Sequence, residues 1–123
     1  MTAAAIFESD ALLAALEDRE LESMDELDFG LVVMDRHGTV TWCNATEAAN
    51  TGFEPTEVIG KSFFESVGPC MNNFLVAQRY ADSEELDESI DYVFTVAMRP
   101  TPVRLRLLAR AGSDRQYLAV RFP

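Results

Sequence analysis

The N-terminal part of the chain carries leucines at helical spacing among acidic residues. Leu12 and Leu16 fall on an i, i+4 stripe, which predicts a helix over residues 9–21. Ser9 is placed to cap this helix at its start. A helix this short is marginal in isolation, so its apolar stripe needs a surface to lie on. With a second short turn over residues 23–27, the pattern predicts a helical segment that docks on the remainder of the chain.

Apolar runs further along the chain predict five strands. Residues 29–34 are apolar at nearly every position, which is typical of a strand that is covered on both faces. Residues 39–43 return after a turn at 35–38, so this pair predicts a hairpin. Three further strands are expected near the end of the chain, at residues 90–98, 103–108 and 116–122.

Two prolines, and then arginines that alternate with apolar residues, mark the region of the expected strand at residues 103–108. Residues 99–102 contain both prolines, and they predict a turn because proline cannot donate to a strand ladder. Residues 103–108 alternate apolar side chains with arginine, which is typical of a strand with two different faces. Arg104 and Arg106 are expected to point outward, toward the acidic N-terminal segment.

Between the hairpin and the last strands the sequence is polar and is interrupted by glycine and proline. Asn44 is placed to cap a short helix, and further short segments are expected at residues 54–60, 61–67 and 73–80. The order of elements predicts an α+β fold with a five-stranded antiparallel sheet, short helices on one face and an N-terminal helical cap on the other.

We expect a single domain over residues 1–123, since 123 residues suffice for one hydrophobic core. Within it, residues 1–28 form the cap and residues 29–123 form the core.

Charge excludes several classes of partner. The chain has 21 acidic and 10 basic residues, a net charge of −11, and this surface repels nucleic acid and anionic membranes. No apolar run approaches the ~20 residues of a membrane span, and no signal peptide is visible, so we expect a cytoplasmic protein, a monomer or weak dimer. Cys43 and Cys70 show no metal-binding spacing, so we expect free thiols.

Residues 28–71 resemble the photoactive yellow protein family, which are blue-light receptors with the PAS fold. The matching segments are Phe29-Gly30, the turn at 35–38, Asn44-Ala45 with Glu47, Thr51-Gly52, the run Val58-Ile-Gly-Lys-Ser-Phe-Phe-Glu-Ser-Val67 and Pro69-Cys70. The downstream matches are Tyr92, Phe94, Met98, Pro100 and Thr101. The Gly-Lys-x-Phe-Phe run that leads to Pro-Cys is the most specific of these motifs.

The resemblance implies a binding site for p-coumaric acid, attached as a thioester at Cys70. In the family, the residue matching Glu47 is a buried, protonated acid that donates a hydrogen bond to the chromophore phenolate, and Thr51 supports it through its hydroxyl. Phe94 and Met98 are expected against the chromophore. Light would isomerise the chromophore from trans to cis, and Glu47 would give its proton to the phenolate. The cap would then be released, and this release would be the signal to an unidentified signalling protein. Such a receptor is not an enzyme.

Two departures from the family pattern bear on this interpretation. The tyrosine that donates a second hydrogen bond to the phenolate is Cys43 here, and a thiol is a weak donor. The arginine that shields the chromophore is Phe53, with Arg99 as a candidate substitute. Without the resemblance, Glu47 reads as a surface residue and Cys70 as an ordinary cysteine. The alternative is therefore a chromophore-free PAS module that mediates interactions or senses redox state or another ligand.

Overall fold

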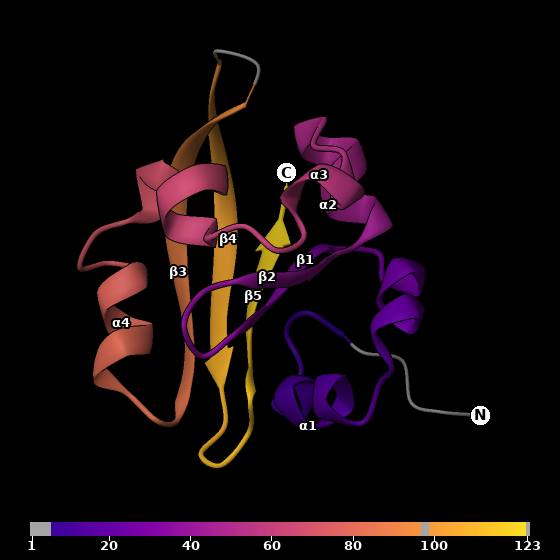
Figure 1. Cartoon of the computed structure of the whole chain (residues 1–123), viewed down its shortest axis with the longest axis vertical. Coiled ribbons are helices and arrows are strands. Elements are labelled where there is room, and N and C mark those ends of the chain that lie inside the picture. Colours follow the sequence, from indigo (N-terminus) through magenta and orange to yellow (C-terminus); the bar gives the residue numbers. More distant parts are fainter. Residues whose placement is uncertain (1–5, 97–98, 123) are drawn as a thin grey trace.

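A five-stranded antiparallel sheet organises the chain in the order β2-β1-β5-β4-β3 (Figure 1). The computed structural model describes residues 6–96 and 99–122, with the backbone alone for residues 94–96. The strands are β1 (Gly30–Asp35), β2 (Val40–Cys43), β3 (Leu86–Val96), β4 (Arg99–Ala109) and β5 (Arg115–Arg121). The predicted fold class, α+β with this sheet, is confirmed.

Short helical segments cover the sheet on its two faces. They are α1 (Leu12–Glu17), η1 (Leu21–Glu26), α2 (Ala45–Thr51), α3 (Pro55–Val58), η2 (Phe63–Val67), η3 (Pro69–Met71) and α4 (Ala77–Asp82). Side chains from α1 and η1 pack in one apolar core, and side chains from α3, η2, η3 and α4 pack in another. Among the described residues, no helix is long and apolar enough to cross a membrane.

Strand β1 separates the two cores, as its continuous apolar sequence predicts. Val32 and Met34 join the core beneath the later helices, whereas Leu31 and Val33 join the core beneath α1 and η1. These side chains are at most 3% exposed. Successive residues of a strand point to opposite faces, so a strand covered on both sides has no polar position.

The N-terminal segment lies on the sheet face that carries Trp42. Phe7, Leu12, Leu16 and Met24 are all buried there, with Leu12, Leu16 and Met24 at 0% exposure. Burial of each such side chain contributes roughly 1.5–3 kcal/mol. We call residues 6–28 the cap from here on.

The predicted turn at residues 99–102 is wrong. Those residues begin β4, and Pro100 and Pro102 pair with Thr95 and Val93 of β3. The pairing of β4 with β5 starts only at Arg104, so the prolines lie where β4 has a free side. A strand with one free edge tolerates proline, because the missing N–H need not face a partner.

Other element boundaries also differ from the prediction. The helix expected over residues 9–21 is shorter and is not capped by Ser9: α1 begins at Leu12, because the Ser9 hydroxyl accepts from the Ala11 N–H in a turn that precedes the helix. The short turn expected over residues 23–27 is part of η1. The helix expected over 73–80 starts at Ala77, because the Asn73 side chain accepts from two backbone N–H groups just before it. Strand β3 begins at Leu86, four residues before the strand expected at residues 90–98.

Candidate functional site

Asn44 connects three elements at the start of α2. Its side-chain oxygen accepts from the backbone N–H of Glu47 at 3.0 Å and of Leu31 at 2.9 Å. Its amide nitrogen donates to the carbonyls of Met24 at 2.9 Å and Phe29 at 3.0 Å. The residue is fully buried, so a single side chain caps α2 as predicted and fixes it to β1 and η1.

Glu47 is a buried carboxyl group with an unused oxygen. The residue is 4% exposed, and no described residue forms a hydrogen bond with its Oε1. Burial raises the pKa of Glu47 to about 7, because the charged form loses its hydration. Gly30 leaves the space for this carboxyl, since a Cβ at Gly30 would overlap Oε1. Burial therefore favours the protonated acid over the carboxylate, and the protonated acid has an O–H that can donate a hydrogen bond.

Cys43 lies within electrostatic range of this carboxyl. It is 2% exposed at the end of β2, and burial raises its thiol pKa to about 12, with further contributions from Glu47 and Asp25. Thr51 ends α2 and donates from its hydroxyl to the Glu47 carbonyl at 2.8 Å. The structure therefore brings Cys43 near the Glu47 carboxyl, whereas the Thr51 hydroxyl bonds to the Glu47 backbone carbonyl and leaves Oε1 without a described partner.

Cys70 lies apart from these three residues, in η3. It is exposed, and partial burial of its thiol raises its pKa. Its backbone carbonyl accepts from the Tyr92 hydroxyl at 2.7 Å and from the Asn73 amide at 3.1 Å, and Asn73 also donates to the Tyr92 oxygen at 2.8 Å. These bonds fix the cysteine backbone to β3. The thiol itself remains accessible to a reagent from solution.

The remaining residues predicted for the site are Phe53, Phe94 and Met98. Phe53 is 38% exposed just after α2, with its backbone N–H bonded to the Thr51 hydroxyl. Only the backbone of Phe94 is described, in β3 opposite Thr101. Met98 lies outside the described residues.

Three supporting residues were not identified as such from the sequence. Asp25 of η1 accepts from the Trp42 indole N–H at 3.2 Å and from the Ala45 N–H at 2.9 Å. Tyr92 and Asn73 hold the Cys70 carbonyl. Asp25 is one of nine acids in the first 28 residues, so no local pattern distinguishes it. Tyr92 and Asn73 belong to elements that only the folded chain brings together.

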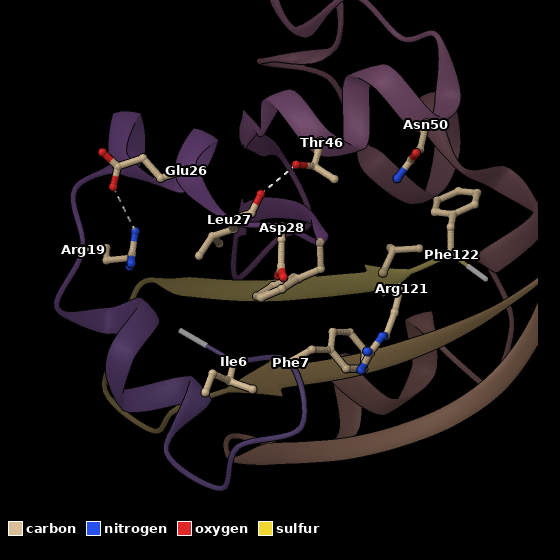
Figure 2. A pocket seen from close by; sticks show the side chains of 12 residues that line it. Ile6, Phe7, Arg19, Glu26, Leu27, Asp28, Thr46, Asn50, Arg121 and Phe122 are labelled. Atoms are coloured by element: carbon tan, nitrogen blue, oxygen red, sulfur yellow. Dashed lines mark hydrogen bonds and ion pairs between the residues drawn. The ribbon is translucent and has the colours of Figure 1, made fainter. Parts of the chain in front are cut away.

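A hollow lies between the cap and the core, and neither Cys43 nor Cys70 lines it. It has a volume of about 610 Å³, and Figure 2 shows its mixed polar and apolar lining. Cap residues Phe7, Arg19 and Asp28 form one side, and core residues such as Arg121 form the other. The cap is therefore incompletely packed along this seam.

Replacing Glu47 by glutamine should flatten the dependence of stability on pH. The folded chain holds this proton more tightly than the unfolded chain, since the pKa is about 7 rather than 4.5. The contribution of Glu47 to the free energy of unfolding is thus fully present below pH 4.5. It falls by about 3 kcal/mol as the pH rises to about 7. Denaturant unfolding across this window should show that loss in the parent chain and not in Glu47→Gln. A variant of an exposed acid, Glu57→Gln, should keep the parent slope, and parallel curves for all three would contradict the assignment.

Comparisons with known proteins show the family of the chain. A family model described as the PAS fold matches residues 17–120, which defines the class of protein. The photoactive yellow protein of Rhodothalassium salexigens is 30% identical over 118 residues, 94% of each chain. The photoactive yellow protein of Halochromatium salexigens is 31% identical over the same length and the same shares.

A solved structure agrees with these relatives. The photoactive yellow protein domain from the sensor histidine kinase Ppr of Rhodospirillum centenum has a TM-score of 0.79 and 32% identity. The match covers 88% of this chain and 97% of that domain. The chain therefore belongs to the photoactive yellow protein family of PAS-fold proteins.

Proposed function

We propose that the chain is a cytoplasmic blue-light receptor that carries p-coumaric acid as a thioester on Cys70 and uses Glu47 as its proton donor. The observation that supports this most is the buried Glu47 carboxyl, whose Oε1 lacks a described partner and whose pKa is about 7. A structural core has no use for an unpaired acid, which is costly to bury. A bound phenolate would accept the hydrogen bond that this acid offers.

Cys70 offers the attachment point for such a group. Cys70 presents an accessible thiol on a backbone held by Tyr92 and Asn73, and a thiolate displaces the leaving group of an activated acyl donor to form a thioester. The donor must be activated, because a free carboxylic acid has no leaving group that a thiolate can displace. When bound, the group supplies light-driven trans–cis isomerisation and a phenolate oxygen.

The chain's own response starts at the Glu47 carboxyl. Loss of its proton leaves a charge in a site that burial makes unfavourable, at a cost of about 3 kcal/mol for a shift from 4.5 to about 7. Helix α2 relieves that cost by moving the carboxylate toward water. Asn44 and Thr46 bond α2 to Met24 and Leu27 of the cap, the second at 2.7 Å, so movement of α2 loosens the cap.

Supplying the protein with activated p-coumaric acid tests the proposal. We expect a yellow species that carries one adduct by intact mass and bleaches reversibly in blue light. A chromophore-free PAS module would gain neither colour nor mass. A redox role for Cys43 has less support, because this thiol is 2% exposed and burial raises its pKa to about 12, whereas thiolate is the form that reacts.

Replacing Cys43 by tyrosine should make the bound phenol more acidic. A hydrogen bond to a charged group contributes roughly 1.5–3 kcal/mol, so a restored tyrosine should lower the phenol pKa by about one to two units. Titrating the visible absorbance of the pigmented protein measures this pKa. A Cys43→Ser variant should shift it less, and an unchanged titration in Cys43→Tyr would show that residue 43 does not face the phenol.

A further inference from the structure

The sheet face beneath the cap combines an apolar centre with polar donors. Its buried or half-buried members from the core are Phe29, Leu31, Val33, Trp42, Leu108, Tyr117 and Ala119. A face of this kind is a liability when bare, because exposed apolar patches of this size bind other proteins. The cap occupies it in the described structure.

Arg106 is the central donor of this face. It lies in β4 at 5% exposure, and Asp87 of β3 binds its guanidinium through two hydrogen bonds of 2.8 Å. Its Nη1 donates to two cap carbonyls, those of Phe7 at 2.7 Å and Ser9 at 2.6 Å. When the cap leaves, this buried nitrogen loses both acceptors.

Other side chains of this face donate hydrogen bonds to carboxylates of the cap. Arg121 donates to Glu8 at 3.2 Å, and its guanidinium carbon lies 5.9 Å from the centre of the Phe7 ring. The Tyr117 hydroxyl donates to Glu17 at 2.5 Å.

Arg115 and Trp42 also donate hydrogen bonds to the cap. Arg115 donates to the Arg19 carbonyl at 3.0 Å, and the Trp42 indole donates to Asp25. Each of these donors loses its acceptor when the cap separates.

The cap is packed unevenly against the core. Leu12 and Leu16 of α1 are fully buried, whereas the hollow of about 610 Å³ leaves the cap poorly packed beside Phe7, Glu26 and Asp28 (Figure 2). Packed contacts are lost at a void, so the part of the cap that lines this hollow is held less tightly than α1.

We propose that this face is the docking surface for a signalling partner that presents an acidic amphipathic helix resembling the cap. The partner would supply two apolar side chains one helical turn apart, a carboxylate for Tyr117 and further carboxylates for Arg121 and Trp42. Charge restricts it to this face: the chain has a net charge of −11, so an acidic helix is repelled elsewhere and meets arginines here. The inference rests on the proposed function, because light-driven release of the cap would open the site.

A peptide with the sequence of residues 6–28 is the probe for this chemistry. The receptor is the full-length chain without pigment, in the dark, with Leu12→Asp and Leu16→Asp to detach its own cap. Fluorescence anisotropy of the labelled peptide should show saturable binding to this variant, at least about tenfold tighter than to the parent chain, which is occupied by its cap. Salt at about 1 M should weaken the binding, as should replacing the peptide's carboxylates by amides.

Matched variants locate the binding on this face. In the cap-detached chain, Arg121→Glu should lower the affinity about fivefold, the scale of one exposed ion pair. Lys61→Glu, at an exposed lysine that follows α3 and lies outside this face, should leave it unchanged. Equal binding to the parent and cap-detached chains, equal binding of the amide peptide, or binding of anionic vesicles in preference to the peptide would overturn the proposal.

A second cap variant guards against misfolding. Phe7→Asp detaches the cap from its other end, and circular dichroism reports whether each variant keeps its sheet. If both variants unfold, the cap is inseparable from the core and the docking surface is excluded. Since the assay uses neither light nor pigment, peptide binding without photochemistry would reject the light-receptor function alone, and photochemistry without peptide binding would reject the docking surface alone.

Discussion

Substituting Cys70 by serine should abolish attachment of p-coumaric acid completely. A serine hydroxyl is a far weaker nucleophile than a thiol and does not accept the acyl group from an activated thioester without a base beside it. Intact mass of the reconstituted protein should show one adduct in the parent chain and none in Cys70→Ser, and the yellow colour should be lost with it.

Cys43→Ser is the matched control for that experiment. Cys43 is 2% exposed and burial raises its thiol pKa to about 12, so it contributes almost no thiolate. The control should therefore keep the full adduct, and peptide mapping should find it on Cys70. An adduct that survives in Cys70→Ser would refute the assigned attachment site.

Replacing Glu47 by glutamine should leave the pigment attached but uncouple light from the cap. Glutamine fills the same space and has no proton to give, so illumination creates no buried carboxylate. The pKa shift of Glu47 from 4.5 to about 7 corresponds to about a hundredfold change in the equilibrium constant between the states with the cap docked and with the cap released, if release exposes the carboxylate to water. We expect the light-induced population with a released cap to fall by that factor.

Trp42 fluorescence is the readout for cap release, because its indole bonds to Asp25 of η1. Blue light should change this emission in the pigmented parent chain and in a Glu57→Gln control. In Glu47→Gln the pigment should still bleach while the emission stays constant. Equal emission changes in all three proteins would mean that another group drives the cap.

Much of the fold was predictable from local pattern because each strand has its own periodicity. The continuous apolar run at residues 29–34 predicted a strand buried on both faces, and β1 separates two cores. The alternation in 103–108 predicted a two-faced strand, and Leu105 and Arg106 belong to opposite faces of β4.

The errors share a physical cause, which is that tertiary contacts override local preference. Pro100 and Pro102 argue for a turn in isolation, but β4 pairs only with β3 at those positions and tolerates them. The start of β3 at Leu86 follows from pairing with Ala109, more than twenty residues away in the sequence.

The candidate site was predictable only through its motifs. The resemblance pointed to Glu47, whereas its burial and raised pKa depend on Gly30 and Asn44, which the fold places beside it. No sequence pattern reveals that Asp25 joins η1 to Trp42 and α2. Such contacts link segments about twenty residues apart, and they exist only in the folded chain.

The most direct test of the central claim is a light-minus-dark infrared difference spectrum of the pigmented protein. In the proposed mechanism, Glu47 is protonated in the dark and gives its proton to the phenolate after illumination. A carbonyl band of a protonated carboxyl group should therefore disappear in the light, with the same kinetics as the bleaching of the pigment, and Glu47→Gln should lack this change. Bleaching of the parent protein with no loss of a protonated carboxyl band would contradict the account.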